Sequence, residues 1–136
     1  MTPQALSKLH KQAFPNARNW TEEEFEVLLA KPATLFVSSD HGFALGQVIA
    51  PECDLQMIAI EPAHQGNGLG SDLMNKFEQA AHERGAIKIL LEVDASDHTV
   101  LKFYERFSFE AIRRLPAYYS KKDGTKTDAI LMQKLL

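Results

Sequence analysis

The spacing of hydrophobic positions predicts two helices and then three strands in the first half of the chain. Apolar residues recur at helical spacing over residues 5–13. Thr21 and Glu24 form a capping-box pair that opens a second helix, which ends before Pro32. Three short apolar runs separated by turn sequences follow, and we predict strands at residues 35–38, 43–50 and 54–61.

Helical and extended patterns alternate in the second half. Apolar side chains step by four residues over 69–81 and mark one face of a helix that Gly85 ends. An Ile- and Leu-rich strand follows at residues 86–93, and then a helix at residues 97–107 that Asp97 can cap. Two strands, at residues 109–114 and 127–135, flank an Asp-Gly hairpin signal. Because hairpin turns and crossover helices both occur, we predict an α/β (α+β) fold with a mixed sheet.

Length and composition indicate a single globular domain over residues 1–136. The chain is 45% hydrophobic and 24% charged, which is ordinary for a soluble protein. The single cysteine, Cys53, excludes an internal disulfide framework and a cysteine-rich zinc site. No apolar run is long enough to span a bilayer, and residues 1–11 lack signal-peptide features, so we expect a cytoplasmic protein without a membrane partner.

The charge is distributed unevenly along the chain. A formal net charge of −3 argues against direct nucleic-acid binding. Residues 101–126 nevertheless carry seven Lys or Arg against three Asp or Glu. Within this basic segment, Arg106, Lys121 and Lys122 are candidates for binding a phosphorylated cofactor or an acidic partner, and a solvated surface is the alternative.

The sharpest motif is a glycine-rich loop, Gln-Gly-Asn-Gly-Leu-Gly, at residues 65–70. Glycines let a backbone approach a ligand closely, and a helix start offers unpaired N–H groups, which together suit a phosphate or pyrophosphate. The lysine of a P-loop is missing, and the spacing is not that of a dinucleotide fingerprint. Gln65, Gly68 and Gly70 instead match the acetyl-CoA pyrophosphate loop, Q/R-x-x-G-x-G/A, although a helix start without any ligand remains the structural alternative.

With this loop, the chain resembles the GNAT superfamily of N-acetyltransferases over nearly its whole length, and most of all the bacterial ribosomal-protein-alanine N-acetyltransferases. Besides the loop, the resemblance rests on Ala13-Phe14-Pro15, Trp20-Thr21, Ile58-Ala59-Ile60-Glu61-Pro62, Leu91-Glu92-Val93, Ala95-Ser96, Tyr104-Glu105, Phe109, Tyr118-Tyr119, Asp123-Gly124 and Asp128-Ala129. It implies a mixed, mostly antiparallel twisted sheet flanked by helices, with acetyl-CoA as the acetyl donor.

Two residues are candidates for acid–base chemistry. Glu92 lies in an apolar strand, and the pattern alone allows a site carboxylate or a solvent-facing residue. The resemblance implies that Glu92 is the general base, which takes a proton from an amine whose pKa is about 7.7–8.0 for an α-amino group. Tyr104 has the spacing of a core aromatic, whereas the resemblance implies that it protonates the leaving thiolate of CoA.

The resemblance also implies which groups bind the substrates. Backbone groups of Ile58, Ala59 and Ile60 would pair with the pantetheine arm and acetyl group, and an N–H near Ile58 would meet the oxyanion. The remaining implied contacts are Gln65, Gly66, Asn67, Gly68, Leu69, Gly70 and Ser71 at the pyrophosphate, and Tyr118 and Tyr119 beside the acceptor peptide.

Two residues depart from the family pattern. Where the family usually has a cofactor-binding Asn, this chain has Asp97, which lacks an amide donor but can still cap a helix. Where the family commonly has Gly, this chain has Ser108, which costs about 1 kcal/mol if the turn needs a positive φ. Direct transfer of the acetyl group from CoA to the amine needs no enzyme thiol, so we interpret Cys53 as structural. The five histidines show no metal-ligand spacing, so we predict no metal site.

The sequence therefore predicts an acetyl-CoA-dependent N-acetyltransferase. The resemblance implies that the acceptor is the N-terminal alanine of a ribosomal protein. Two alternatives remain, namely a GNAT enzyme for another protein or a small amine, and a non-catalytic acyl-CoA-binding module. The joint presence of Glu92 and Tyr104 favours an enzyme.

Overall fold

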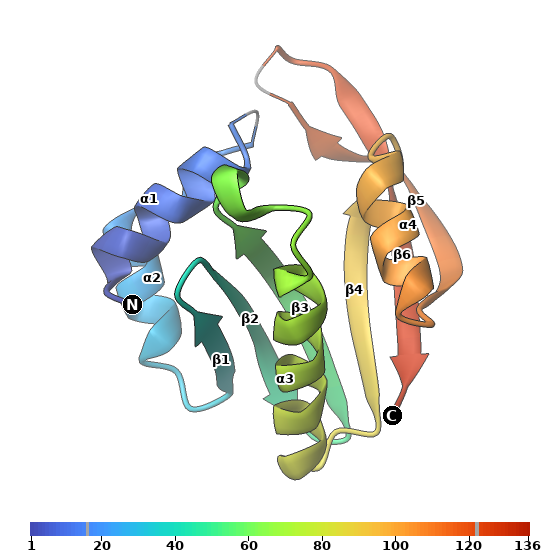
Figure 1. Cartoon of the computed structure of the whole chain (residues 1–136). Helices are drawn as coiled ribbons and strands as arrows, with labels where there is room; N and C mark the ends of the chain where they lie inside the picture. The colour runs from blue at the N-terminus through green and yellow to red at the C-terminus, as the bar shows by residue number, and fades with distance from the viewer. Residues whose placement is uncertain (16, 122) are drawn as a thin grey trace.

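The computed structural model describes residues 1–15, 17–121 and 123–136, which form a sheet with helices on both faces (Figure 1). In chain order the elements are α1 (Pro3–Ala13), α2 (Glu22–Leu29), β1 (Thr34–Ser39), β2 (Gly42–Ile49), β3 (Glu52–Ile60), the 3-10 turn η1 (Pro62–His64), α3 (Leu69–Glu83), β4 (Lys88–Asp94), α4 (His98–Arg106), β5 (Glu110–Ser120) and β6 (Lys126–Leu135). The order and type of these elements agree with the predicted ones. None of the helices in the described ranges is both long and apolar enough to cross a membrane.

Six strands make up the sheet, in the order β1-β2-β3-β4-β6-β5. Adjacent strands pair antiparallel, except for β3 and β4, which are parallel. The parallel pair follows from α3, which crosses from the end of β3 to the start of β4. The mixed, mostly antiparallel sheet that the sequence predicts is therefore present.

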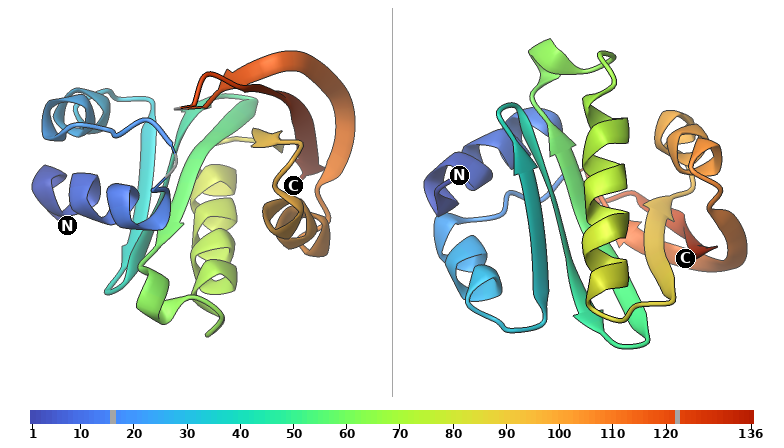
Figure 2. Two further views of the ribbon diagram at one scale, coloured as in Figure 1. Left: turned by 90° about the horizontal axis from the view of Figure 1, so that it is seen from above. Right: turned by 60° about the horizontal axis from the view of Figure 1, so that its bottom comes forward.

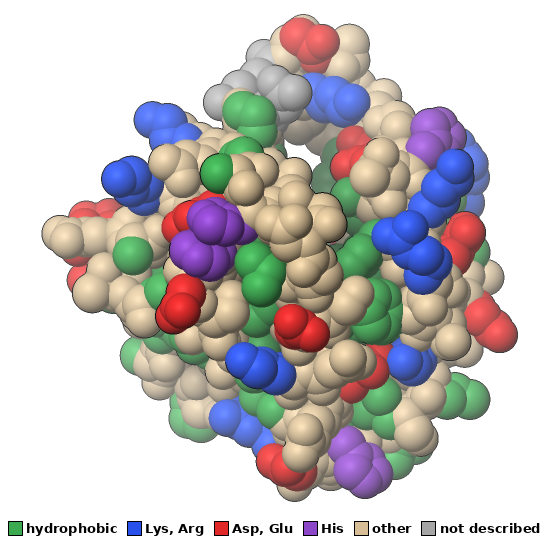
Figure 3. Space-filling view, in the orientation of Figure 1, with side chains coloured by type: hydrophobic (Ala, Val, Ile, Leu, Met, Phe, Trp, Pro, Cys, Tyr) green, Lys and Arg blue, Asp and Glu red, His purple; other side chains and the backbone are tan. Residues whose placement is uncertain are grey.

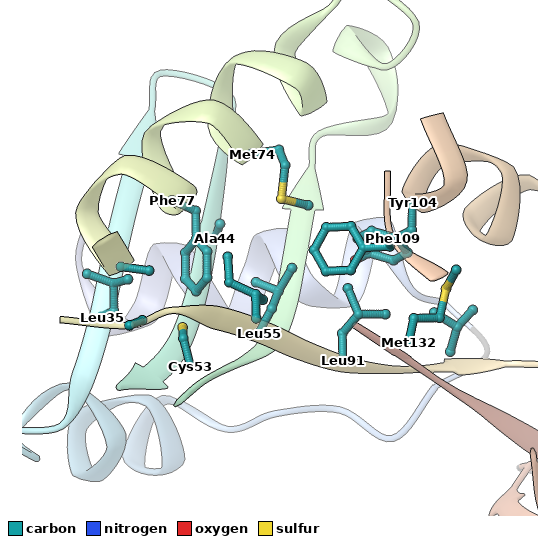
Figure 4. Close-up of a cluster of buried hydrophobic side chains, with 14 residues drawn as sticks. Leu35, Ala44, Cys53, Leu55, Met74, Phe77, Leu91, Tyr104, Phe109 and Met132 are labelled. Carbon is teal, nitrogen blue, oxygen red and sulfur yellow. The ribbon is translucent and has the colours of Figure 1, made fainter. Parts of the chain in front are cut away.

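Two separate cores lie on the two faces of the sheet. On one face, α3 and α4 pack on the strands through a cluster that includes Met74, Phe77 and Tyr104 (Figures 2 and 4). On the other face, α1 and α2 pack through Leu6 and Phe25 against β2 and β3. The α1–α2 pair packs on the β1–β3 side, and none of the helices in the described ranges lies over the corresponding face of β4 (Figure 2).

Local signals explain where the helices begin and end. The Thr21 hydroxyl accepts a hydrogen bond from the Glu24 N–H, and the Glu24 carboxylate accepts one from the Thr21 N–H, which completes the predicted capping box of α2. Asp97 caps α4 by accepting from the Val100 N–H at 3.2 Å. Gly85 follows α3 with a φ of +90°, which a glycine adopts without strain.

Strand β5 is longer than the sequence predicts, because it continues through Pro116 to Ser120. Proline cannot donate a hydrogen bond to a neighbouring strand, so it disfavours the interior of a sheet. It is tolerated here because β5 is the edge strand of the sheet. The register between β5 and β6 shifts between Leu115 and Tyr119, and Ala117 has a φ of +49° within that shift.

Candidate active site

The sheet opens between its two central strands. β3 and β4 pair only from Glu52 to Asp54 on β3, although β3 continues to Ile60 and β4 to Asp94. Beyond that point β3 keeps its partner β2, and β4 keeps its partner β6. In Figure 1 the two strands diverge, and Figure 3 shows the surface hollowed below the β5–β6 hairpin. Across the described residues, the β4-facing edge of positions 55–60 therefore has no strand partner.

Glu92 lies on β4 beside this opening. Leu91 and Val93 point into the core under α3 and α4, whereas Glu92 is exposed on the opposite face. That face of β4 is the one that α1 and α2 leave uncovered. The alternation that the strand pattern predicts therefore presents the Glu92 carboxylate to the open side of the sheet.

Both tyrosines of the predicted acceptor site are electrostatic neighbours of Glu92. The Glu92 carboxylate raises the pKa of Tyr118 by interacting with its hydroxyl and by its negative charge. Burial raises the pKa of Tyr119 to about 12, and the charge of Glu92 adds to that effect. The two tyrosine rings lie perpendicular at a centroid distance of 5.2 Å. The structure thus joins residues from β4 and β5, although β6 separates these strands in the sheet.

The bulge in β5 accounts for how neighbouring tyrosines approach the same carboxylate. Asp128 on β6 accepts hydrogen bonds from the Ala117 N–H at 2.8 Å and from Arg114 Nε at 2.6 Å. These two bonds, the first from the backbone, lower the pKa of the Asp128 carboxyl. Asp128 stabilises the bulge in β5, a role that the sequence analysis did not assign to it. Its hydrogen bond with Ala117 forms only when β5 and β6 pair.

Tyr104 is buried in α4, with 6% of its surface exposed. Its ring packs edge-on against Phe109 (Figure 4) and against Phe103. Burial raises the pKa of its hydroxyl, and the nearby Tyr119 and Asp97 raise it further, so the phenol stays protonated at neutral pH. Tyr104 is therefore both a core aromatic and an electrostatic neighbour of Tyr119, whose own pKa is raised by the charge of Glu92.

The glycine loop has the backbone geometry that close approach to a ligand requires. Gly66 and Gly68 have φ values of +83° and +81°, and a Cβ added at either would meet nothing within 4 Å. Gly68 is the N-cap of α3 and makes no side-chain cap, so the first N–H groups of this 15-residue helix are open to an anion. Gly70 is needed for packing instead, because a Cβ there would lie 3.0 Å from the Phe103 ring. An exposed, positively polarised helix start of this kind fits the pyrophosphate of CoA.

The end of β3 is held against this loop. Gln65 Nε2 donates to the Ile60 carbonyl at 3.1 Å, so this side chain fastens the loop to the strand. Ala59 is buried, whereas Ile58 and Ile60 are half-buried. The loop residues Asn67 and Ser71 are exposed, and Leu69 is half-buried at the first position of α3. The predicted donor-binding segments, 58–60 and 65–71, therefore lie next to each other at the mouth of the opening.

An acidic neighbour of Glu92 was missed by the sequence analysis. Asp54 occupies the last paired position of β3, opposite Leu90. Partial burial raises the pKa of the Asp54 carboxyl, and the charges of Glu52 and Glu92 raise it further. Period-two alternation puts Asp54 on the outer face of β3, but only the pairing of β3 with β4 brings it toward Glu92.

The remaining predicted residues divide between structural roles and surface charge. Ser108 has a φ of +69°, so the turn where the family commonly has Gly does use a positive φ. Cys53 is fully buried, and burial raises the pKa of its thiol to about 12, which agrees with a structural interpretation. Lys121 Nζ lies 3.9 Å from the Asp94 carboxylate, whereas Arg106 is exposed at the end of α4, and Lys122 lies outside the described residues.

Comparison with known sequences identifies the family. The model of the Acetyltransferase (GNAT) family matches residues 4–109. The ribosomal protein bS18-alanine N-acetyltransferase of Escherichia coli (strain K12) is 32% identical over 124 residues, which cover 88% of this chain and 80% of that protein. The protein of the same name from Haemophilus influenzae is 34% identical over 91 residues, covering 67% of this chain and 62% of its own length.

Solved structures share the fold. The crystal structure of the ribosomal-protein-S18-alanine N-acetyltransferase from Escherichia coli matches with a TM-score of 0.85 at 28% identity, covering 98% of this chain and 86% of that chain. Ard1 from Thermoplasma volcanium matches with a TM-score of 0.83 at 20% identity, covering 100% and 94%. The predicted fold, enzyme class and acetyl-CoA donor are confirmed. With a family match over most of its length and relatives above 30% identity, the chain belongs to the Acetyltransferase (GNAT) family.

Proposed function

We propose that this chain is a cytoplasmic enzyme that transfers the acetyl group of acetyl-CoA to the N-terminal amine of a ribosomal protein whose first residue is alanine. The relatives named for this acceptor support the proposal, since one of them is 32% identical over 88% of this chain. The observation that carries it is the Glu92 carboxylate, which is exposed on the uncovered face of β4 beside the break in the sheet and is an electrostatic neighbour of Tyr118.

In this proposal Glu92 is the general base. An α-amino group with a pKa of about 7.7–8.0 arrives largely protonated at neutral pH, and it attacks a thioester only after losing a proton. Glu92 takes that proton directly or through a water molecule. The Tyr118 hydroxyl is proposed to orient the carboxylate, and the acceptor amine is proposed to enter through the opening beside β4.

Tyr104 is the general acid of the proposed reaction. When the carbon–sulfur bond of the thioester breaks, the CoA thiolate needs a proton. The raised pKa of Tyr104 keeps its hydroxyl protonated until that step, and Tyr119 links it to the Glu92 side of the site. The amine deprotonated by Glu92 and the thiolate protonated by Tyr104 give net transfer of acetyl with no covalent enzyme intermediate.

The donor lies along the break between β3 and β4. Backbone groups at Ile58, Ala59 and Ile60 are adjacent to the unpaired edge and are proposed to bind the pantetheine arm. The N–H groups from Gly66 to Ser71 are proposed to bind the pyrophosphate, with Arg106 adding positive charge from α4. Asp97 is not included in this set, because its carboxylate caps α4 and adds negative charge.

The acceptor is tested by measuring acetyl transfer to three classes of amine. The panel contains peptides with N-terminal alanine taken from ribosomal protein sequences, the same peptides with a blocked N-terminus and an internal lysine, and small amines. We expect the highest kcat/KM for the free N-terminal alanine peptides. A matched peptide with N-terminal proline, whose amine is secondary, serves as the poor-acceptor control.

The panel separates the proposal from its alternatives. Preference for lysine peptides or small amines would keep the acetyltransferase but overturn the ribosomal acceptor. Tight acetyl-CoA binding by calorimetry, with no transfer to any amine of the panel, would instead support an acyl-CoA-binding module without catalysis.

A further inference from the structure

Two histidines and one glutamate meet on the surface next to the glycine loop. His41 Nδ1 lies 3.3 Å from Glu61 Oε2, and His64 Nε2 lies 3.7 Å from the same oxygen. The imidazole rings stack at a centroid distance of 3.5 Å with 9° between their planes. All three side chains are about two-fifths exposed, and Figure 3 shows a pair of histidine side chains in contact on the outer surface.

Backbone contacts bring these residues together. His41 lies in the turn between β1 and β2, and its carbonyl accepts a hydrogen bond from the Glu61 N–H at 2.9 Å. The η1 turn then places His64 one turn after Glu61, since the His64 N–H donates to the Glu61 carbonyl at 2.9 Å. The cluster therefore depends on the ends of β2 and β3 rather than on flexible side chains alone.

The donor set is that of a transition-metal site. Imidazole nitrogens and a carboxylate oxygen are common zinc ligands, with bonds of about 2.0–2.1 Å that put neighbouring ligand atoms of a tetrahedron about 3.3–3.4 Å apart. The two distances to Glu61 Oε2 are close to that edge length, and the three candidate ligand atoms all lie within 4.8 Å of one another. Among the residues that the structure describes, no Lys or Arg forms an ion pair with Glu61, so the carboxylate is available to a cation.

We propose that His41, Glu61 and His64 form a binding site for a divalent transition-metal ion of the zinc type. Each residue supplies one ligand atom, and water completes the tetrahedron on the exposed side. The rings, now stacked, tilt apart to direct both nitrogens at the ion, which their exposure allows. Since Gln65 directly follows His64, the ion ties the β1–β2 turn to the segment that leads into the glycine loop. The sequence analysis predicted no metal site because the five histidines show no metal-ligand spacing, and His41 is 20 residues away from Glu61.

The site is tested with Zn²⁺ and Co²⁺ on the chain without a histidine tag. We expect one Zn²⁺ per chain by calorimetry and the visible absorption of tetrahedral Co²⁺, displaced by Zn²⁺. Glu61→Gln keeps the size of the side chain and one acceptor oxygen, and it should weaken Zn²⁺ binding at least about tenfold, as should His41→Ala and His64→Ala. His82→Ala removes an exposed histidine of α3 and serves as the matched control, with unchanged affinity.

Metal-free thermal unfolding of each variant separates loss of a ligand from loss of the fold. Wild-type protein that binds neither ion, or that binds Zn²⁺ equally well after Glu61→Gln, overturns the proposal. Loss of binding in His82→Ala, with binding retained in His41→Ala and His64→Ala, also overturns it. Because the readout is metal binding, the result is independent of which amine the enzyme acetylates.

Discussion

Replacing Glu92 by glutamine should remove the proposed base without destabilising the fold. The side chain is exposed on the uncovered face of β4, and the core residues Leu91 and Val93 point the other way. Glutamine has nearly the size of glutamate, and its side-chain carbonyl can still accept a hydrogen bond. We therefore expect the free energy of unfolding of Glu92→Gln to stay within about 0.5 kcal/mol of wild type.

The expected kinetic effect is large. A positioned general base contributes about 10²–10⁴-fold, which is about 3–5 kcal/mol of transition-state free energy. We expect kcat to fall by that factor at pH 7 with little change in acetyl-CoA affinity. Because an α-amino group has a pKa of about 7.7–8.0, the deficit should shrink toward pH 9, where most of the acceptor is already deprotonated.

The assay follows release of the CoA thiol between pH 7 and pH 9, with acetyl-CoA affinity measured by calorimetry. Glu26→Gln is the matched control, because Glu26 is an exposed glutamate on α2, which packs against α1 and β1 rather than against β4. Turnover of Glu92→Gln within twofold of wild type at pH 7 would refute the assignment of the base. A tenfold loss of acetyl-CoA affinity would instead show that Glu92 acts on the donor.

Three further predictions concern Tyr104, Asp97 and His10. Tyr104→Phe keeps the ring contacts but removes the hydroxyl that would donate the proton. We therefore expect turnover to fall about 100-fold while the thermal unfolding temperature stays nearly constant. Unchanged turnover would show that Tyr104 acts only as a core residue. Asp97→Ala removes the α4 cap and should cost about 1 kcal/mol in urea unfolding, which Asp97→Asn should not. Burial, helped by the charge of Arg18, lowers the pKa of His10, so protonation favours the unfolded chain and wild-type stability should decrease as the pH falls below about 6.5. That part of the decrease should be absent from urea titrations of His10→Phe, and its persistence would contradict this cause.

Local chemistry was enough to predict the elements and the place of the glycine loop. The order of helices and strands, the capping box at Thr21, the helix end at Gly85 and the glycine loop all depend on residues within a few positions of one another. The alternation that exposes Glu92 follows from the two-residue period of a strand, which is also a local property. The positive φ at Ser108 was suggested by the resemblance instead, because the family commonly has Gly at this position.

Only the tertiary structure decided which of these elements meet. The insertion of β6 between β4 and β5, and the bulge at Ala117 that Asp128 holds, bring Tyr118 to Glu92. The break between β3 and β4, and the meeting of His41 with Glu61, likewise depend on strand register. Register is set by packing and by hydrogen bonds between segments far apart in the chain, so the spacing of residues within one segment cannot reveal it.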